Sequence, residues 1–186
     1  MFTLNKKKRI QLLAIVAATA MATSGVGMSA SHAAAQTVNI GISADMDKLD
    51  PHTSTNFATV RILGLVYSEL VESTTDLKIV PGLAKSWYWN ASSTQLTMYM
   101  RTGVKFHDGT TFTAADAKAS LERVKASGSA AGNLGLVTSI VASGAQLTIN
   151  FSAPNAPFLA ALDGVNMAMV SKADIDAGLI GKKVNG

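Results

Sequence analysis

Hydrophobic and polar residues alternate most regularly between positions 96 and 106. This period of two is typical of a strand with one buried and one exposed face. We therefore predict a strand over residues 96–101 and a second short extended stretch over residues 104–106. The apolar positions are Leu96, Met98 and Met100, followed by Val104 and Phe106 after a break at Gly103.

A turn and a capped helix are predicted directly after this strand. Asp108 and Gly109 form a dipeptide that tolerates positive φ, so we expect a tight turn there. Thr113 can cap a helix, and Asp116, three residues later, can complete a capping-box-like pair at the positive helix end. The helix would bury one face, formed by Ala117, Leu121 and Val124.

Weaker patterns predict the other elements of a mixed α/β fold with mainly antiparallel pairing. Strands are expected over residues 37–43 and 147–151, and a short helical turn is expected at the start of residues 83–89. A long apolar helix is expected over residues 56–72, and a short one over residues 158–162. Polar loops are expected over residues 45–55 and 126–135.

The N-terminal region has the pattern of a secretory signal peptide. A basic cluster precedes an apolar stretch over residues 10–21, and the small residues Ala33 and Ala35 come just before Gln36. We predict cleavage after Ala35, which makes residues 1–35 the signal peptide. A membrane anchor is the alternative, but the apolar stretch is short for a membrane span.

The balance of charges and the lack of cysteine exclude several classes of partner and site. The predicted signal peptide holds four of the 16 basic residues, namely Lys6, Lys7, Lys8 and Arg9, so 12 basic and 12 acidic residues remain. This balance gives no support to a nucleic-acid partner. The chain has no cysteine, which excludes thiolate chemistry and the thiol needed for a lipid anchor. We expect a soluble periplasmic or otherwise extracytoplasmic protein.

The residues whose side chains could bind a metal or a ligand are explained more simply by structural roles. His107 and Asp108 adjoin a glycine turn, and His52 follows a proline in a loop, so we predict no metal site. Trp87 and Trp89 are expected to pack one domain against its neighbour, although stacking on a ligand is an alternative. Arg101 could hold a ligand carboxylate, but a cross-strand contact is the simpler role.

No motif of a known catalytic type is present. The sequence has no nucleophile elbow, no SxxK motif, no carboxylates at a catalytic spacing and no phosphate-binding loop. We therefore predict a protein that is not an enzyme, with no catalytic residues, no cofactor and no metal. A secreted hydrolase whose catalytic residues lie beyond Gly186 is the alternative, and an exported structural or interaction module is a third possibility.

Four segments, in this order, resemble the family 5 extracellular solute-binding proteins. They are LDPH at residues 49–52, VYSELVE at 66–72, PGLAKSW at 81–87 and MRTGVKFHDGTTFTAADA at 100–117. These proteins are the peptide- and nickel-binding receptors of bacterial ABC importers, and the resemblance extends over residues 38–186. The last segment is long, and its motifs come in a fixed order, which makes the resemblance specific.

The resemblance implies part of a two-lobed, periplasmic-binding-protein-like α/β fold that closes around its ligand. By analogy, residues 36–73 would begin the first lobe, residues 74–170 would form an accessory mixed α/β domain, and residues 171–186 would return toward the first lobe. The opposing lobe would be absent from this chain. In this arrangement the loop after the first predicted strand borders the cleft, so the candidate ligand-binding residues are Ser43, Ala44, Asp45, Met46 and Asp47.

The function implied by the resemblance is that of a monomeric solute-binding component that imports oligopeptides or dipeptides. Its partners would be the ligand and the permease subunits in the membrane. Asp45 or Asp47 could meet a cationic group of the ligand, whereas the alternative is a solvated acidic loop. A nickel complex, a sugar or an opine remains open as the ligand.

Overall fold

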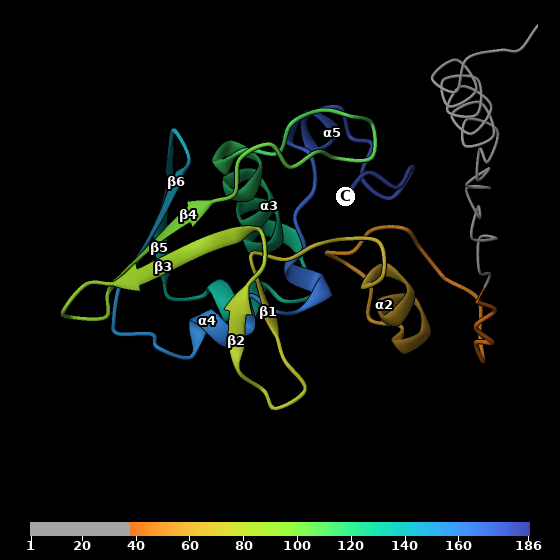
Figure 1. Cartoon of the computed structure of the whole chain (residues 1–186), viewed down its shortest axis with the longest axis horizontal. Coiled ribbons are helices and arrows are strands. Elements are labelled where there is room, and N and C mark those ends of the chain that lie inside the picture. The colour runs from red at the N-terminus through yellow and green to blue at the C-terminus, as the bar shows by residue number, and fades with distance from the viewer. Residues whose placement is uncertain (1–37) are drawn as a thin grey trace, which may run out of the picture. The chain divides into compact units, whose positions relative to one another are not determined.

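The computed structural model describes residues 38–186 (Figure 1). All the helices and strands below belong to one compact unit, Gly41–Gly186, which is the second unit of the chain. The predicted signal peptide and its cleavage site lie outside the described residues. Within the described range, no helix has the length and hydrophobicity needed to cross a membrane.

A four-stranded antiparallel sheet forms the centre of the second unit. Its strands are β3 (Ala84–Trp89), β4 (Gln95–Met100), β5 (Val137–Ser143) and β6 (Gln146–Phe151), in the order β3-β4-β6-β5. The alternation seen in the sequence is confirmed in β4, because Leu96, Met98 and Met100 are all buried. These side chains share one hydrophobic core with the inward-facing residues of β6 and with helix α3 (Ala114–Ser127).

Helix α3 begins where the sequence predicts. The backbone N–H and the hydroxyl of Thr113 both donate to Asp116 Oδ2, at 2.9 and 2.6 Å. This carboxylate also lies at the positive end of the helix, where a negative charge is stabilising. Ala117, Leu121 and Val124 are fully buried, so the predicted apolar face is confirmed.

The predicted turn at Asp108 and Gly109 is also confirmed. Gly109 has φ of +85°, and Asp108 Oδ1 accepts hydrogen bonds from the backbone N–H and the hydroxyl of Thr110. The short extended stretch predicted over residues 104–106 forms one antiparallel bridge, between Lys105 and Thr111, and no longer strand.

The long helix predicted over residues 56–72 is wrong in its second half. Helix α2 (Phe57–Leu63) ends at Gly64, whose N–H closes the last turn. Further on, β1 (Val71–Ser73) pairs with β2 (Ile79–Pro81) as an antiparallel hairpin. Backbone pairing with residues downstream therefore makes Val71–Ser73 a strand. Leu63 and Tyr67 belong to a second, smaller core, and Leu70 belongs to the main core.

Two further predictions of local structure are wrong. Residues 38–43 form no strand, and Val38, Ile40 and Ile42 are exposed, because no strand in the described part of the chain pairs with them. Residues 84–89 form strand β3 rather than a helical turn, because their backbone groups pair with β4. The pairing includes a register shift between Ala84 and Ser86 that the sequence pattern does not reveal.

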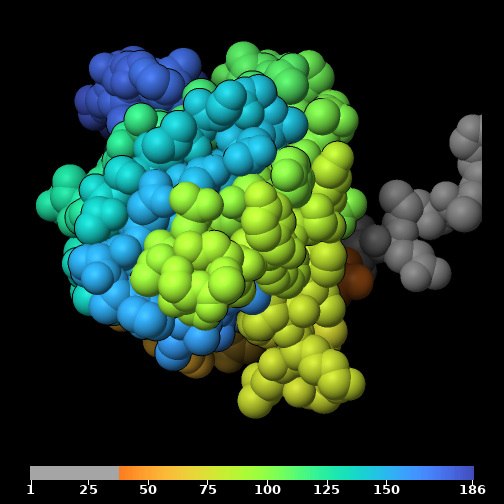
Figure 2. Space-filling view, turned by 90° about the vertical axis from the view of Figure 1, so that its left-hand side faces the viewer, coloured from red at the N-terminus to blue at the C-terminus, as the bar shows by residue number. Residues whose placement is uncertain are grey.

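The remaining elements are short, and most of them pack against α3. Part of the loop predicted over residues 126–135 is helical, because α3 continues to Ser127 and a 3₁₀ helix follows. Figure 2 shows yellow-green atoms of the β3–β4 region beside blue atoms of the segment after β6, where the N–H of Asn155 donates to Ser93 O at 3.2 Å. These elements are η1 (Ala131–Leu134), α4 (Phe158–Ala161), η2 (Val165–Met167) and α5 (Lys172–Asp176).

Candidate functional site

The loop predicted to border the ligand is an irregular segment, and most of its residues are exposed to solvent. Ser43, Ala44, Asp45 and Asp47 are exposed, while Met46 is half-buried and packs against the smaller core. The Met46 side chain therefore anchors the loop and turns the neighbouring polar groups outward. The structure thus shows an exposed loop, and its role in binding stays a prediction.

Helix α2 holds the acidic end of this loop. The hydroxyl of Thr59 donates to Asp47 Oδ1 at 2.6 Å, and the N–H of Asp47 donates back to Thr59 Oγ1 at 3.0 Å. The hydrogen bond from Thr59 lowers the pKa of Asp47, so this carboxylate is ionised at neutral pH. Asp45 Oδ1 accepts the N–H of Met46 at 2.8 Å. Each carboxylate therefore uses one oxygen within the fold.

A buried polar cluster fixes the chain immediately after the loop. Both nitrogens at the end of the Arg123 guanidinium donate to the Asp50 carboxylate, at 3.0 and 2.6 Å. The Asp50 side chain is 13% exposed and that of Arg123 is 19% exposed. Burial alone would raise the pKa of Asp50, but the hydrogen bonds and charge of Arg123 outweigh it and lower this pKa.

His52 completes this cluster as a neutral side chain. Its Nε2 lies 2.8 Å from the carbonyl oxygen of Ala168, and its Nδ1 lies 2.7 Å from Arg123 Nη1. Since a carbonyl only accepts and a guanidinium only donates, Nε2 carries the proton and Nδ1 accepts. Burial lowers the pKa of His52 to about 4, and the charge of Arg123 acts in the same direction. The structural role predicted for His52 is confirmed.

The sequence reasoning missed Arg123 and Glu69. Arg123 lies 73 positions from Asp50, so no local pattern could have paired them. Glu69 lies just before β1, and burial, aided by the charges of Asp163 and Glu72, raises its pKa to about 7. No side-chain hydrogen bond within residues 38–186 reaches its carboxyl group. Glu69 therefore changes protonation near neutral pH.

The other residues considered in the sequence are part of the scaffold. Arg101 donates to the carbonyl oxygens of Gly82 and of Pro81, the last residue of β2, so it joins the end of β4 to the end of β2. Trp87 and Trp89 are half-buried and pack against the main core that includes their own sheet, and packing against a neighbouring domain stays a prediction. In the described residues, no three His, Cys, Asp or Glu side chains gather closely enough to hold a metal ion.

His107 and Asp108 help to hold the last residues of the chain. The N–H of Gly186 donates to His107 Nδ1 at 3.0 Å, and Asn185 Nδ2 donates to Asp108 Oδ2 at 2.9 Å. A second hydrogen bond from the same nitrogen reaches Asp174 Oδ2 at 2.6 Å. This turn therefore stabilises residues 185–186 within the fold.

Comparison with known proteins places these features in a family. The family described as bacterial extracellular solute-binding proteins, family 5 Middle, matches residues 78–186. The glutathione-binding protein GsiB of Escherichia coli is 30% identical over 115 residues, which cover 62% of this chain and 21% of that protein. This chain therefore spans about a fifth of the length of that curated relative.

Solved structures of periplasmic binding proteins have the same fold. DppA of Helicobacter pylori, in complex with the peptide STSA, is 26% identical, with a TM-score of 0.68 over 77% of this chain and 34% of that one. AgaA of A. tumefaciens R10, in complex with agropinic acid, is 27% identical, with a TM-score of 0.68 over 72% of this chain and 28% of that one.

These matches confirm the predicted fold class, which is part of an α/β periplasmic-binding-protein fold. GsiB, DppA and AgaA are all binding proteins, and none of the three is described as a hydrolase. The family match extends over more than half of the described residues and includes the sheet, helix α3 and the turn at Asp108. The chain belongs to the bacterial extracellular solute-binding proteins of family 5.

Proposed function

We propose that this chain is part of the extracytoplasmic receptor of an ABC importer that takes up peptides. The observation that carries the proposal is the 26% identity to the peptide-bound DppA, over 77% of this chain. A receptor of this kind binds without chemistry: the peptide backbone pairs with main-chain groups, and closure of the lobes presents a new surface to the permease.

Within this proposal, residues 43–47 contribute to one wall of the binding cleft. Asp45 and Asp47 are exposed carboxylates, and each retains one oxygen that makes no hydrogen bond with the described residues. A carboxylate accepts hydrogen bonds and attracts cations, so these two suit the ammonium group of a peptide. The anchoring of Met46 and Asp47 to the fold holds the loop in place before the ligand arrives, which reduces the cost of ordering it.

The domain division is also proposed. Residues 36–73 begin the first lobe, residues 74–170 form the accessory domain, and residues 171–186 return toward the first lobe. The hairpin of β1 and β2 crosses the boundary after Ser73, so its backbone hydrogen bonds would join the first lobe to the accessory domain. A cleft that encloses a ligand needs a second wall, which an opposing lobe would supply.

Export to the periplasm and action as a monomer complete the proposal. The basic cluster, the apolar stretch and the small residues before Gln36 support cleavage after Ala35. N-terminal sequencing of the protein purified from the periplasm tests this directly. We expect the mature protein to begin at Gln36, and an N-terminus that retains residues 10–21 contradicts cleavage.

Isothermal titration calorimetry on the complete natural receptor tests the ligand. The titrants are dipeptide and oligopeptide mixtures, simple sugars, a nickel–histidine complex and agropinic acid. We expect heat of binding with peptides, and a weaker affinity when Asp45 and Asp47 are both replaced by Asn. Asp76→Asn is the matched control, because Asp76 is an exposed carboxylate paired with Lys78 in the β1–β2 hairpin. Binding of a sugar, a metal complex or agropinic acid without any peptide contradicts the peptide assignment.

A further inference from the structure

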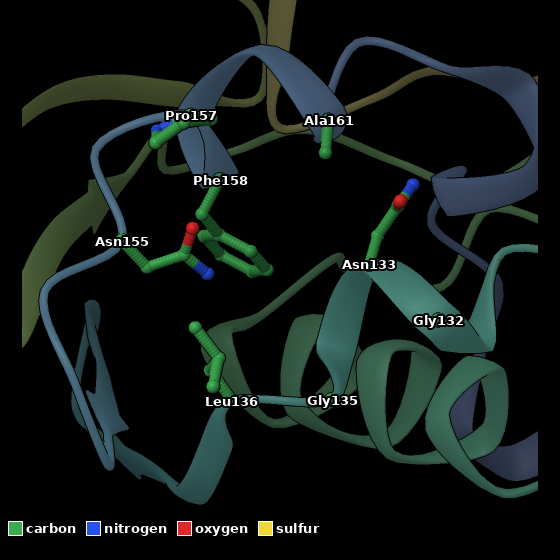
Figure 3. A pocket seen from close by; sticks show the side chains of 8 residues that line it. All are labelled: Gly132, Asn133, Gly135, Leu136, Asn155, Pro157, Phe158 and Ala161. Atoms are coloured by element: carbon green, nitrogen blue, oxygen red, sulfur yellow. The ribbon is translucent and has the colours of Figure 1, made fainter.

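A pocket of about 420 Å³ lies where the chain enters β5 and leaves β6 (Figure 3). Residues of η1 form one side, and the loop before α4, together with α4 itself, forms the other. Its volume lies within the range of small-molecule sites in proteins. The pocket shares no residue with the loop at residues 43–47.

The lining of this pocket is apolar and amidic, without a charged side chain among the described residues. Leu136, which is 40% exposed, and the exposed Pro157 supply the apolar surface of the pocket, whereas Phe158 is only 2% exposed. Asn155 directs its amide toward the Phe158 ring, while Asn133 stands across the pocket near Ala161 (Figure 3). A charged ligand would lose hydration here without gaining a counter-charge.

The two amides in the pocket differ from the other asparagines of the folded unit. The side chains of Asn90, Asn166 and Asn185 each make two or more hydrogen bonds within the fold. No residue of the described range makes a hydrogen bond to the side-chain amide of Asn133 or Asn155. Each of these amides offers two N–H donors and a carbonyl acceptor.

We propose that this pocket binds a neutral secondary amide that carries a small aliphatic group. The ligand carbonyl accepts from one asparagine amide, and the ligand N–H donates to the other. The aliphatic group packs on Leu136 and Pro157, which removes their apolar surface from water. The acetamido group of an amino sugar and an internal peptide bond both have this chemistry.

Nuclear magnetic resonance on the ¹⁵N-labelled chain distinguishes these two sources. One arm titrates N-acetylglucosamine, and the other titrates N-acetylalanine methylamide, a blocked peptide without charge. Glucose and acetate serve as probes that lack a neutral amide. We expect the side-chain NH₂ signals of Asn133 and Asn155 to shift. A response to the sugar alone identifies the acetamido group, a response to the blocked peptide alone identifies the peptide bond, and a response to both shows that the amide suffices.

Variants test whether the amides make the contacts. We expect Asn155→Ala and Asn133→Ala each to weaken binding about tenfold, as the loss of one hydrogen bond does. Gln146→Ala is the matched control, because Gln146 is an amide at the other end of β6 and its Nε2 donates only to Thr148 Oγ1, at 3.0 Å. Absence of shifts in both arms overturns the proposal, and so do equal shifts with glucose. The titration of the unmodified chain decides the matter even if a variant does not fold.

Discussion

Replacement of Arg123 by methionine should cost this fold far more stability than the loss of an ordinary surface charge. Methionine and arginine have similar helix propensities, so the change leaves α3 intact. It removes two hydrogen bonds to Asp50 and one to His52, at 3.0, 2.6 and 2.7 Å. The Asp50 carboxylate, 13% exposed, would then be buried without a counter-charge.

The expected cost follows from this burial. Removal of one partner of a buried ion pair costs about 3–5 kcal/mol in general, and since both side chains keep some exposure we expect about 3 kcal/mol here. Lys118→Met is the matched control, because Lys118 lies on the same helix and pairs with Glu122 at 3.6 Å with side chains 40% and 52% exposed. Its loss should cost about 0.5 kcal/mol or less.

Urea denaturation of the purified chain and its two variants measures this difference. At pH 7 the free energy of unfolding should fall by about 3 kcal/mol for Arg123→Met and hardly change for Lys118→Met. On acidification the cost of Arg123→Met should shrink, because Asp50 without its guanidinium takes up a proton and no longer holds a buried charge. Equal losses in the two variants at pH 7 would show that the cluster does not stabilise the fold.

Three further predictions concern the same folded unit. The pKa of His52 is about 4 in the folded chain, against its ordinary value of 6.5 in the unfolded chain. The folded protein should therefore lose about 3 kcal/mol of stability as the pH falls from 6.5 to 4. Glu69, whose pKa is raised from 4.5 to about 7, adds stability as the pH falls from 7 to 4.5 and so nearly cancels the loss from His52. Urea denaturation across this range should therefore show a stability that rises on acidification in His52→Gln but not in the unmodified chain, and equal profiles would contradict this. Gly82→Ala would place a Cβ 2.7 Å from the carbonyl oxygen of Glu69, and we expect it to lower the thermal midpoint, whereas Gly132→Ala, with open space around it, should not. Asp116→Ala removes acceptors for the N–H groups of Thr113 and Lys172 and should cost about 1 kcal/mol or more in urea denaturation, an expectation that an unchanged midpoint would contradict.

The anchored loop connects these stability predictions to the proposed function. Residues 43–47 come directly before the segment that holds Asp50 and His52, and His52 contacts Ala168 of the smaller core. A loop attached to such a cluster keeps its position when no ligand is bound. The loss of Arg123 should therefore weaken ligand binding as well as stability, even though Arg123 is not one of the predicted ligand residues.

The sequence by itself determined the elements that depend on neighbouring residues. Strand β4, the turn at Asp108 and Gly109, and the start of α3 at Thr113 all follow from interactions within a few positions. Pattern and capping report such interactions directly. The same residues carry the family resemblance, which the comparisons confirmed over residues 78–186.

The tertiary structure alone decided the features that depend on distant partners. Residues 71–73 form a strand because residues 79–81 pair with them, although the apolar spacing of the residues before them predicts a helix that continues to Glu72. Residues 38–43 have the alternation of a strand but no partner in the described chain, so they remain irregular. Arg123 meets Asp50 and His52 only because α3 packs beside the segment after the loop. Hydrogen bonds and ion pairs between remote positions have no local pattern, so they are visible only in the folded chain.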